Sequence, residues 1–201
     1  MVVVKKGILL AGALLGTILL LALALNRLNR LVEPAMEPSA IQRTGPLVLD
    51  AGHGGEDGGA VSLTGVPESQ INLAIVLKLR DILGFCGVDP ILLRDEDISL
   101  YDEGAGTLRE KKRSDLKNRV ERIEAVKGGT LLSIHQNPYP GSRYHGAHVF
   151  YAPTEGSQSL AEHVQNSIKT ALQPGNERAV KQIPDTVYIM NHVTCPTILI
   201  E

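Results

Sequence analysis

Cysteine is scarce in this chain, which has only Cys86 and Cys195. Two cysteines cannot build the disulfide framework of a small secreted scaffold, and they allow at most a single bridge. Neither belongs to a CxxC pair or a Cys/His cluster, so a cysteine-based metal site is excluded. The chain also lacks an excess of charge, because its formal net charge is −2. Without a broad positive field, nucleic acid is not an expected partner.

Disorder is excluded by composition. Hydrophobic residues make up 43% of the chain and charged residues 21%, which are values of a globular protein. The length of 201 residues suits one ordinary domain with a short extension. Residues 47–201 are enough to bury a hydrophobic core without disulfides or a structural metal.

The sequence does contain one long apolar run, from Gly7 to Leu25, preceded by Lys5 and Lys6. As a helix, this run would span close to the ~30 Å hydrocarbon core of a bilayer. We expect residues 1–25 to be a transmembrane anchor that contacts the membrane through residues 7–25. A cleaved signal segment is the alternative, because Ala22-Leu23-Ala24 resembles a cleavage site. Either way, the rest of the chain is predicted to be anchored or secreted outside the cytoplasm.

Residues 26–46 are polar and contain Pro34, Pro38 and Pro46, which is typical of a linker. After it, short apolar runs alternate with helical patterns, and the apolar runs are continuous rather than alternating. This predicts a single α/β domain over residues 47–201 with a largely parallel sheet. The predicted strands cover residues 47–49, 91–93, 130–134, 147–151 and 197–200.

Three helices are predicted between these strands. The first has Pro67 in its first turn, ends near Phe85, and should bury a face formed by Ile71, Ile75, Leu79 and Ile82. The second is capped by Ser114 and stops before Gly128, and the third follows the spacing of residues 160, 164, 168 and 172.

Three predicted strands end on residues that can bind metal or move protons: His53, His135 and Glu201. Ligand sites of parallel sheets lie beyond the carboxyl ends of the strands, so these side chains should converge. Imidazole and carboxylate ligands together suit Zn²⁺. A dinucleotide site is excluded in the same loop, because Asp57 stands where the last glycine of GxGxxG is required.

The segment Asp50–Ala60 closely resembles the opening motif of the zinc-dependent N-acetylmuramoyl-L-alanine amidases. The resemblance continues through Gly65–Glu68, Ser133–Asn137 and Cys195–Glu201, in the order and spacing of the family. It implies a mixed, mostly parallel sheet with helices on both faces. It further implies that zinc is bound by His53, Glu68 and His135, that Glu201 is the catalytic glutamate, and that the substrate is peptidoglycan, cleaved between N-acetylmuramic acid and L-alanine.

Two further runs, Leu108–Arg119 and Gly146–Tyr151, resemble most the germination-specific, spore-cortex branch of this family. That likeness implies cortex peptidoglycan as the substrate, as a step toward muramic lactam. It also implies a peptidoglycan deacetylase in the same pathway, and an activator protein is a further candidate partner.

Other residues are weaker candidates. Asp50 and Asn137 are expected to orient the ligands or the loop, although a simple turn role would explain them equally. His192 is a candidate site residue because it lies in the loop before the last strand. The basic run of residues 109–122 should be a solvated helix face or contact anionic substrate.

The family continues beyond its catalytic glutamate, whereas this sequence stops at Glu201. A truncated sequence or a lost closing element would explain that difference. Two rival functions follow: a non-catalytic peptidoglycan-binding or regulatory module, and a metal hydrolase acting on another amide.

Overall fold

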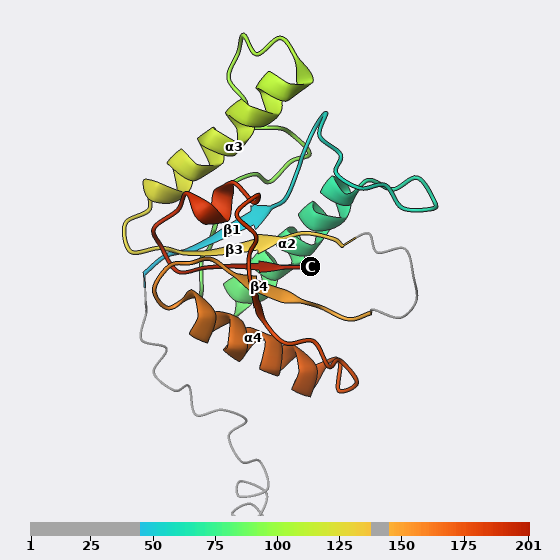
Figure 1. Cartoon of the computed structure of the whole chain (residues 1–201), viewed down its shortest axis with the longest axis vertical. Helices are drawn as coiled ribbons and strands as arrows, with labels where there is room; N and C mark the ends of the chain where they lie inside the picture. Colours follow the sequence, from blue (N-terminus) through green and yellow to red (C-terminus); the bar gives the residue numbers. More distant parts are fainter. Residues whose placement is uncertain (1–44, 138–144) are drawn as a thin grey trace, which may run out of the picture. The chain divides into compact units, whose positions relative to one another are not determined.

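The computed structural model describes residues 45–137 and 145–201, which form one α/β unit (Figure 1). Its sheet has six strands in the order β2-β1-β3-β6-β4-β5. The strands are β1 (Leu47–Ala51), β2 (Ile91–Leu92), β3 (Thr130–Ile134), β4 (Val149–Tyr151), β5 (Lys181–Gln182) and β6 (Thr197–Ile200). The helices are α2 (Glu68–Phe85), α3 (Leu108–Glu124), α4 (Ser157–Ala171) and the short 3₁₀ helix η1 (Ile189–Asn191).

The sheet is mixed and mostly parallel, as predicted. All its pairings are parallel except that of β4 with β6. The register aligns Ala51 of β1 with Ile134 of β3, and Ile134 with Ile200 of β6. These three strands therefore finish level with one another, which brings the residues that follow them to one edge.

Helices cover both faces of this sheet, which confirms the predicted layering (Figure 1). Val48 and Leu131 point into a cluster with α3 and η1, whereas Leu49 and Ile134 pack on α2 on the other face. Because neighbouring residues of a strand point to opposite faces, an unbroken apolar run is what such a doubly covered strand requires. In the second half of the sheet, Ile198 packs against α4.

The predicted buried face of α2 is wrong in part. Ile75 and Ile82 are 39% and 62% exposed, whereas Ser69, Asn72 and Val76 are buried. Of the predicted face, Leu79 does pack against the core. The helix is apolar over a wide arc, so spacing alone could not select the buried side, and two polar residues occupy it because they contact the loop after β1.

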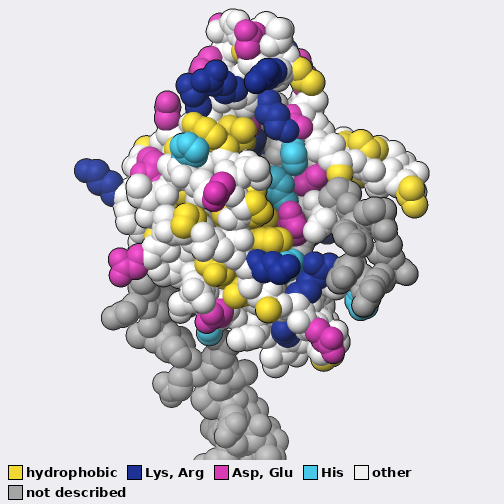
Figure 2. All heavy atoms as spheres, viewed as in Figure 1, with side chains coloured by type: hydrophobic (Ala, Val, Ile, Leu, Met, Phe, Trp, Pro, Cys, Tyr) yellow, Lys and Arg dark blue, Asp and Glu magenta, His cyan; other side chains and the backbone are white. Residues whose placement is uncertain are grey.

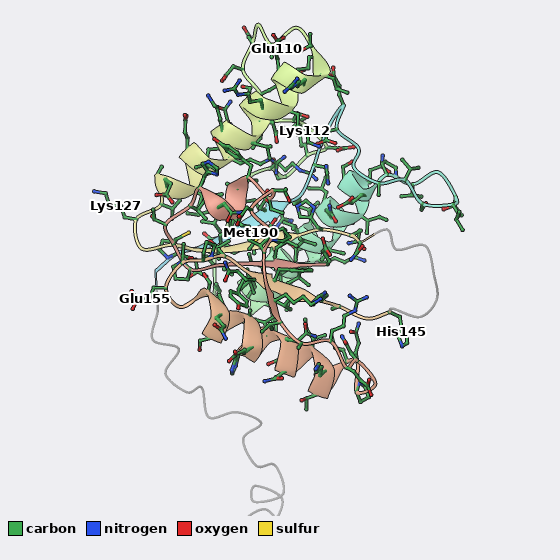
Figure 3. The ribbon with its side chains drawn as sticks, viewed as in Figure 1. Glu110, Lys112, Lys127, His145, Glu155 and Met190 are labelled. Atoms are coloured by element: carbon green, nitrogen blue, oxygen red, sulfur yellow. The ribbon has the colours of Figure 1, made fainter. Side chains whose placement is uncertain are left out.

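The start of α3 is also corrected. Thr107, not Ser114, caps the helix: its side chain accepts a hydrogen bond from the Glu110 N–H, and Glu110 accepts one from the Thr107 N–H. This reciprocal capping box satisfies two amides that the first turn leaves unpaired. Lys and Arg side chains gather over this end of the helix (Figure 2), and Glu110 lies at its tip (Figure 3). Ser114 instead lies inside the helix, and its side chain donates to Asp102 in the loop before α3.

Smaller corrections concern the second half of the chain. The predicted strand 147–151 begins at Val149, and neither β5 nor η1 was predicted. Leu172 follows the helical spacing but lies beyond the end of α4 and is 76% exposed. Cys86 and Cys195 are both free thiols, so the single allowed bridge is not formed.

Within residues 45–137 and 145–201, no helix is long and apolar enough to cross a membrane. The run from Gly7 to Leu25 lies outside these residues, as does most of the predicted linker, so the anchor stays a prediction.

Candidate metal centre

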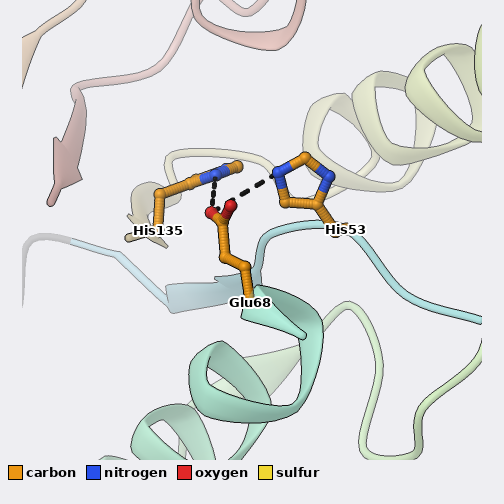
Figure 4. A group of neighbouring side chains, drawn as sticks. All are labelled: His53, Glu68 and His135. Atoms are coloured by element: carbon orange, nitrogen blue, oxygen red, sulfur yellow. Dashed lines mark hydrogen bonds and ion pairs between the residues drawn. The ribbon is translucent and has the colours of Figure 1, made fainter. Parts of the chain in front are cut away.

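Three side chains predicted to share a metal lie together at the carboxyl edge of the sheet (Figure 4). Nε2 of His53 is 3.4 Å from Oε1 of Glu68, and Nδ1 of His135 is 3.1 Å from the same oxygen. One donor atom from each residue lies within 4.8 Å of the other two. Two imidazole nitrogens thus converge on one carboxylate oxygen, a donor set that suits zinc.

His53 is presented by a tightly folded loop after β1. Its φ of 62° lies in the left-handed region, which residues other than glycine seldom adopt and which is often found at functional sites. Asp57 Oδ2 lies 3.0 Å from Nδ1 of His53 and accepts a hydrogen bond from it, so that Nε2 of the ring faces Glu68. The hydrogen bonds to Asp57 and then to Glu68 raise the pKa of His53 to about 9. The two carboxylates therefore favour a positive charge at this imidazole.

Glu68 is the first residue of α2, where the unpaired amides of the helix favour a carboxylate. Its oxygens accept hydrogen bonds from the backbone N–H groups of Ala60 and Gln136, both at 3.0 Å, and from Asn72 Nδ2 at 3.3 Å. Burial alone would raise the pKa of Glu68, but bonds from His135, His53 and the two amides hold it far below its ordinary value. Glu68 is consequently a fixed, ionised carboxylate.

Two glycines make room for this arrangement. A Cβ at Gly52 would lie 2.3 Å from the His135 ring, and a Cβ at Gly59 would lie 2.7 Å from Oε2 of Glu68. Gly59 also has a φ of 68°, which glycine adopts without strain. The backbone thus closes around the three side chains without crowding the space between them, and the donor set fits zinc.

A buried ion pair supports the loop from below. Asp50 is fully buried, accepts a hydrogen bond from Ser133 Oγ at 2.7 Å, and pairs with Arg119 of α3. Arg119 also donates to the His53 carbonyl at 2.7 Å. Burial would raise the pKa of Asp50, but the charge of Arg119 brings it below its ordinary value. Ser133 and Arg119 thus fix Asp50 beneath the loop that presents His53.

The prediction of a solvated basic face is wrong for Arg119, which is 1% exposed. A second buried arginine, Arg94, donates to the carbonyls of Ala51, Gly52 and Ser69. Sequence reasoning missed Arg94 entirely. It carries no local signal, since only the fold brings it beneath the loop.

Asp57 and Asn72 were missed as well, but each carried a weak signal. Asp57 lies four residues after His53, within one loop, and Asn72 lies one helical turn after Glu68. Side chains four apart on a helix are neighbours, and here Asn72 bonds both Glu68 and the Gly52 carbonyl.

Glu201 lies next to this group, at the end of β6. The His135 N–H donates to the Ile200 carbonyl at 2.9 Å, and Glu201 exchanges two backbone hydrogen bonds with His148, at 2.7 and 3.0 Å. Burial raises the pKa of the Glu201 side chain, with partial opposition from His135 and from a hydrogen bond to Asn137. Asn137 thus contacts Glu201. His192, by contrast, is exposed and stacks on Tyr188 at 3.9 Å.

A sequence model of the N-acetylmuramoyl-L-alanine amidases matches residues 47–201. The chain belongs to this family. Among curated relatives of this amidase is the germination-specific N-acetylmuramoyl-L-alanine amidase of Bacillus subtilis. It is 32% identical over 190 residues, which are 94% of this chain and 78% of the relative. As a cell-wall amidase, the protein meets peptidoglycan outside the cytoplasm.

The fold is also similar to those of solved amidase structures. The amidase CwlD of Clostridioides difficile, solved in complex with the GerS lipoprotein, is 39% identical with a TM-score of 0.73, over 78% of this chain and 81% of that one. AmiC2 of Nostoc punctiforme is 28% identical with a TM-score of 0.60, over 79% and 78%. The similarity to the amidase LytC of Bacillus subtilis, 28% identical over 77% of this chain, spans only 28% of that longer protein.

Proposed function

We propose that this amidase hydrolyses the amide between N-acetylmuramic acid and L-alanine, with zinc held by His53, Glu68 and His135 and with Glu201 as the general base. The observation that carries the proposal is the convergence of two imidazoles and one carboxylate within 4.8 Å, beside a glutamate at the end of β6. Two histidines, one glutamate and an open position form a known set of catalytic zinc ligands.

Zinc in this site would polarise the amide carbonyl and acidify a water molecule. Side chains of the protein transfer the proton and position the ligands. Glu201 takes a proton from the attacking water and passes it to the departing amine of L-alanine. Its carboxyl is half-buried, and burial raises its pKa, which makes it a better proton acceptor. Asp57, Asn72 and the amide of Gln136 hold the ligands in place.

We further propose that the natural substrate is spore-cortex peptidoglycan. The supporting observation is the similarity to a relative named germination-specific amidase, along 94% of this chain. The product would be muramic acid freed of its stem peptide, on which a separate deacetylase would act toward muramic lactam. A strain lacking this chain should then make spores with little muramic lactam.

The setting of the enzyme is part of the proposal. Residues 7–25 are proposed to anchor it in a membrane, with the domain on the outer side. Because CwlD was solved with a lipoprotein, a lipoprotein partner or activator is proposed for this chain as well. Protease added to intact protoplasts should then remove the domain, and full protection would contradict the orientation.

The central test is digestion of purified muropeptides by the zinc-loaded full chain. The expected product is the intact stem peptide with a free L-alanine amine, identified by mass spectrometry. Glu201→Gln should keep its zinc and lose on the order of 10²–10⁴-fold in rate. Binding without release would indicate the non-catalytic module, and release of acetate or single amino acids would indicate another amide hydrolase. An active Glu201→Gln variant would remove the base assignment.

A further inference from the structure

A groove of about 350 Å³ opens between α3 and the residue that precedes η1. It is lined by Arg109, Lys112, Arg113 and Leu116 of α3 and by Tyr188. Residues three, four and seven apart lie on one face of a helix, so the four α3 side chains form a single stripe. Leu116 packs against the core cluster that contains Ile189. The α3 groove therefore has an apolar contact at its base, a basic wall on the helix and an aromatic wall opposite.

The aromatic wall is held in place by its neighbour. The ring of Tyr188 stacks on the ring of His192, with the centroids 3.9 Å apart and an angle of 18° between the planes. Nδ1 of His192 lies 2.8 Å from the Tyr188 carbonyl and donates to it, since a carbonyl oxygen only accepts. His192 thus supports a wall of the α3 groove, which gives this candidate residue a place outside the group of metal ligands.

The positive charge of the α3 groove is neutralised only in part. Lys112 pairs with Asp57 at 3.3 Å. Arg109 and Arg113 are exposed, and within residues 45–137 and 145–201 neither guanidinium forms an ion pair or a hydrogen bond. The two arginines are four residues apart on the helix, where like charges repel. Arg109 also lies in the first turn, where the helix dipole disfavours a cation. An anion between the two guanidinium groups would offset both unfavourable interactions.

The α3 groove borders the metal centre through Lys112. The oxygen of Asp57 that binds Lys112 is the same atom that lies 3.0 Å from Nδ1 of His53. In Figure 2, Lys and Arg side chains lie over the beginning of α3, next to His and acidic side chains below them. A peptide advances by about 3.3–3.6 Å per residue. A stem peptide whose first amide lies at the metal therefore enters the α3 groove within a few residues.

The chemistry of peptidoglycan then identifies the anion. Its sugars are uncharged where a stem peptide is attached, so its negative charges are carboxylates of the stem peptides. Guanidinium binds carboxylate through two parallel hydrogen bonds, and Tyr188 and Leu116 offer apolar surface to the rest of the peptide. We propose that Arg109 and Arg113 bind a carboxylate of the stem peptide and so direct the peptide from the metal centre into the α3 groove. The proposal rests on the proposed amidase function.

The test uses two synthetic stem peptides that begin with L-alanine and differ only in whether their carboxyl groups are free or converted to carboxamides. Calorimetry measures their binding to the zinc-loaded full chain and to two double variants, one with Arg109→Gln and Arg113→Gln and one with Arg109→Lys and Arg113→Lys. Hydrolysis of the two corresponding muropeptides is measured in parallel.

The matched control combines Lys78→Gln with Lys127→Gln, which removes the same amount of positive charge away from the α3 groove. Lys78 is exposed on α2, the helix that covers the other face of the sheet. Lys127 is exposed and projects from the loop after α3 (Figure 3).

The wild type should bind the carboxylate peptide about tenfold more tightly than the carboxamide, a difference of about 1.4 kcal/mol. The double glutamine variant of Arg109 and Arg113 should lose this preference. The double lysine variant should keep part of it, because lysine retains the charge without the paired donors, and the control should keep all of it. In hydrolysis, the double glutamine variant should raise KM for the carboxylate muropeptide about tenfold and change kcat less than about twofold.

Equal weakening of both peptides in the double glutamine variant would indicate a merely structural role and overturn the proposal. An equal loss of preference in the control would attribute the effect to net charge and overturn it as well. A wild type that binds both peptides equally would overturn it whatever the variants do. A wild type that prefers the carboxylate peptide through Arg109 and Arg113 but hydrolyses neither muropeptide would support this inference and contradict the proposed function instead.

Discussion

The two sides of the metal centre treat positive charge differently. On the α3 side, Arg119, Lys111 and Lys112 each pair with a carboxylate of the strand or loop that presents His53. On the β4–β5 side, Nη1 of Arg178 lies 3.2 Å from Nδ1 of His148, and the charge of Arg178 lowers the pKa of the Glu201 side chain. Arginine thus supports the His53 loop on one side and lies beside Glu201 on the other.

This difference follows from electrostatics. A cation bonded to a carboxylate loses most of its attraction for a second anion, and when both are buried their main effect is on the folded state. Counting basic residues near a site is therefore less informative than asking what each one is bonded to.

The largest effect is expected from removing the metal ligands that separate the two sides. His53→Ala combined with His135→Ala leaves one carboxylate, which cannot hold zinc alone. Zinc content after gel filtration should fall from one ion per chain to almost none, and hydrolysis should become undetectable. The matched control replaces two exposed histidines, His145 and His163, and should keep full zinc. Retention of zinc by the first variant would sink the ligand assignment.

The next largest effect should come from the buried cation on the α3 side. Arg119→Met leaves the charge of Asp50 buried without its partner, which typically costs about 3–5 kcal/mol of the free energy of unfolding. Urea denaturation followed by circular dichroism measures this. Lys117→Met on the exposed side of the same helix should change stability by less than about 0.5 kcal/mol. Similar values for both variants would show that the buried pair is not structural.

A smaller effect is expected from the carboxylate that orients His53. Asp57→Asn keeps the shape of the side chain but weakens its hydrogen bond to Nδ1. Changes of this kind typically lower metal affinity about 10- to 100-fold. Competition with a chromogenic chelator measures the zinc affinity. Glu56→Gln, on the same loop but bonded to Lys111, should keep wild-type affinity, and an equal loss in both would attribute the effect to loop charge.

The smallest effect should come from Lys111→Gln. Its partner Glu56 is exposed, and surface ion pairs typically contribute about 0–1 kcal/mol. Stability should change within that range, and KM for muropeptides should stay within about twofold of wild type. A tenfold rise in KM would contradict this expectation and give Lys111 a role in substrate binding.

The strands and the three converging residues could be predicted from the sequence because their signals are local. Each strand that carries a site residue is a continuous apolar run, and His53, His135 and Glu201 stand directly at or just after the ends. The family motifs added Glu68, which by itself is an ordinary acidic residue at a helix start. The register of the sheet then brings these residues together, because β1, β3 and β6 end at the same level.

The helix faces and the supporting network could not be predicted, for a common reason. Asn72 and Arg119 are polar, so hydrophobic spacing assigns them to solvent, yet both are buried because they bond backbone carbonyls of the His53 loop. Conversely, Ile82 is apolar but exposed. A pattern of hydrophobicity cannot reveal a polar residue whose partners come from a distant part of the chain.

The entry of the chain into β1 has a mechanical consequence. Pro46 accepts a hydrogen bond from Thr130 at 2.9 Å, and β1 then runs between β2 and β3 before it reaches the His53 loop. A pull on the chain before Gly45 would load β1 along its own axis, so its ladders to both neighbours would share the force in shear. The hydrogen bonds of the sheet would bear this tension before it reached the metal ligands. A load applied through a tether at this end would therefore first shear the hydrogen bonds that join β1 to β2 and β3.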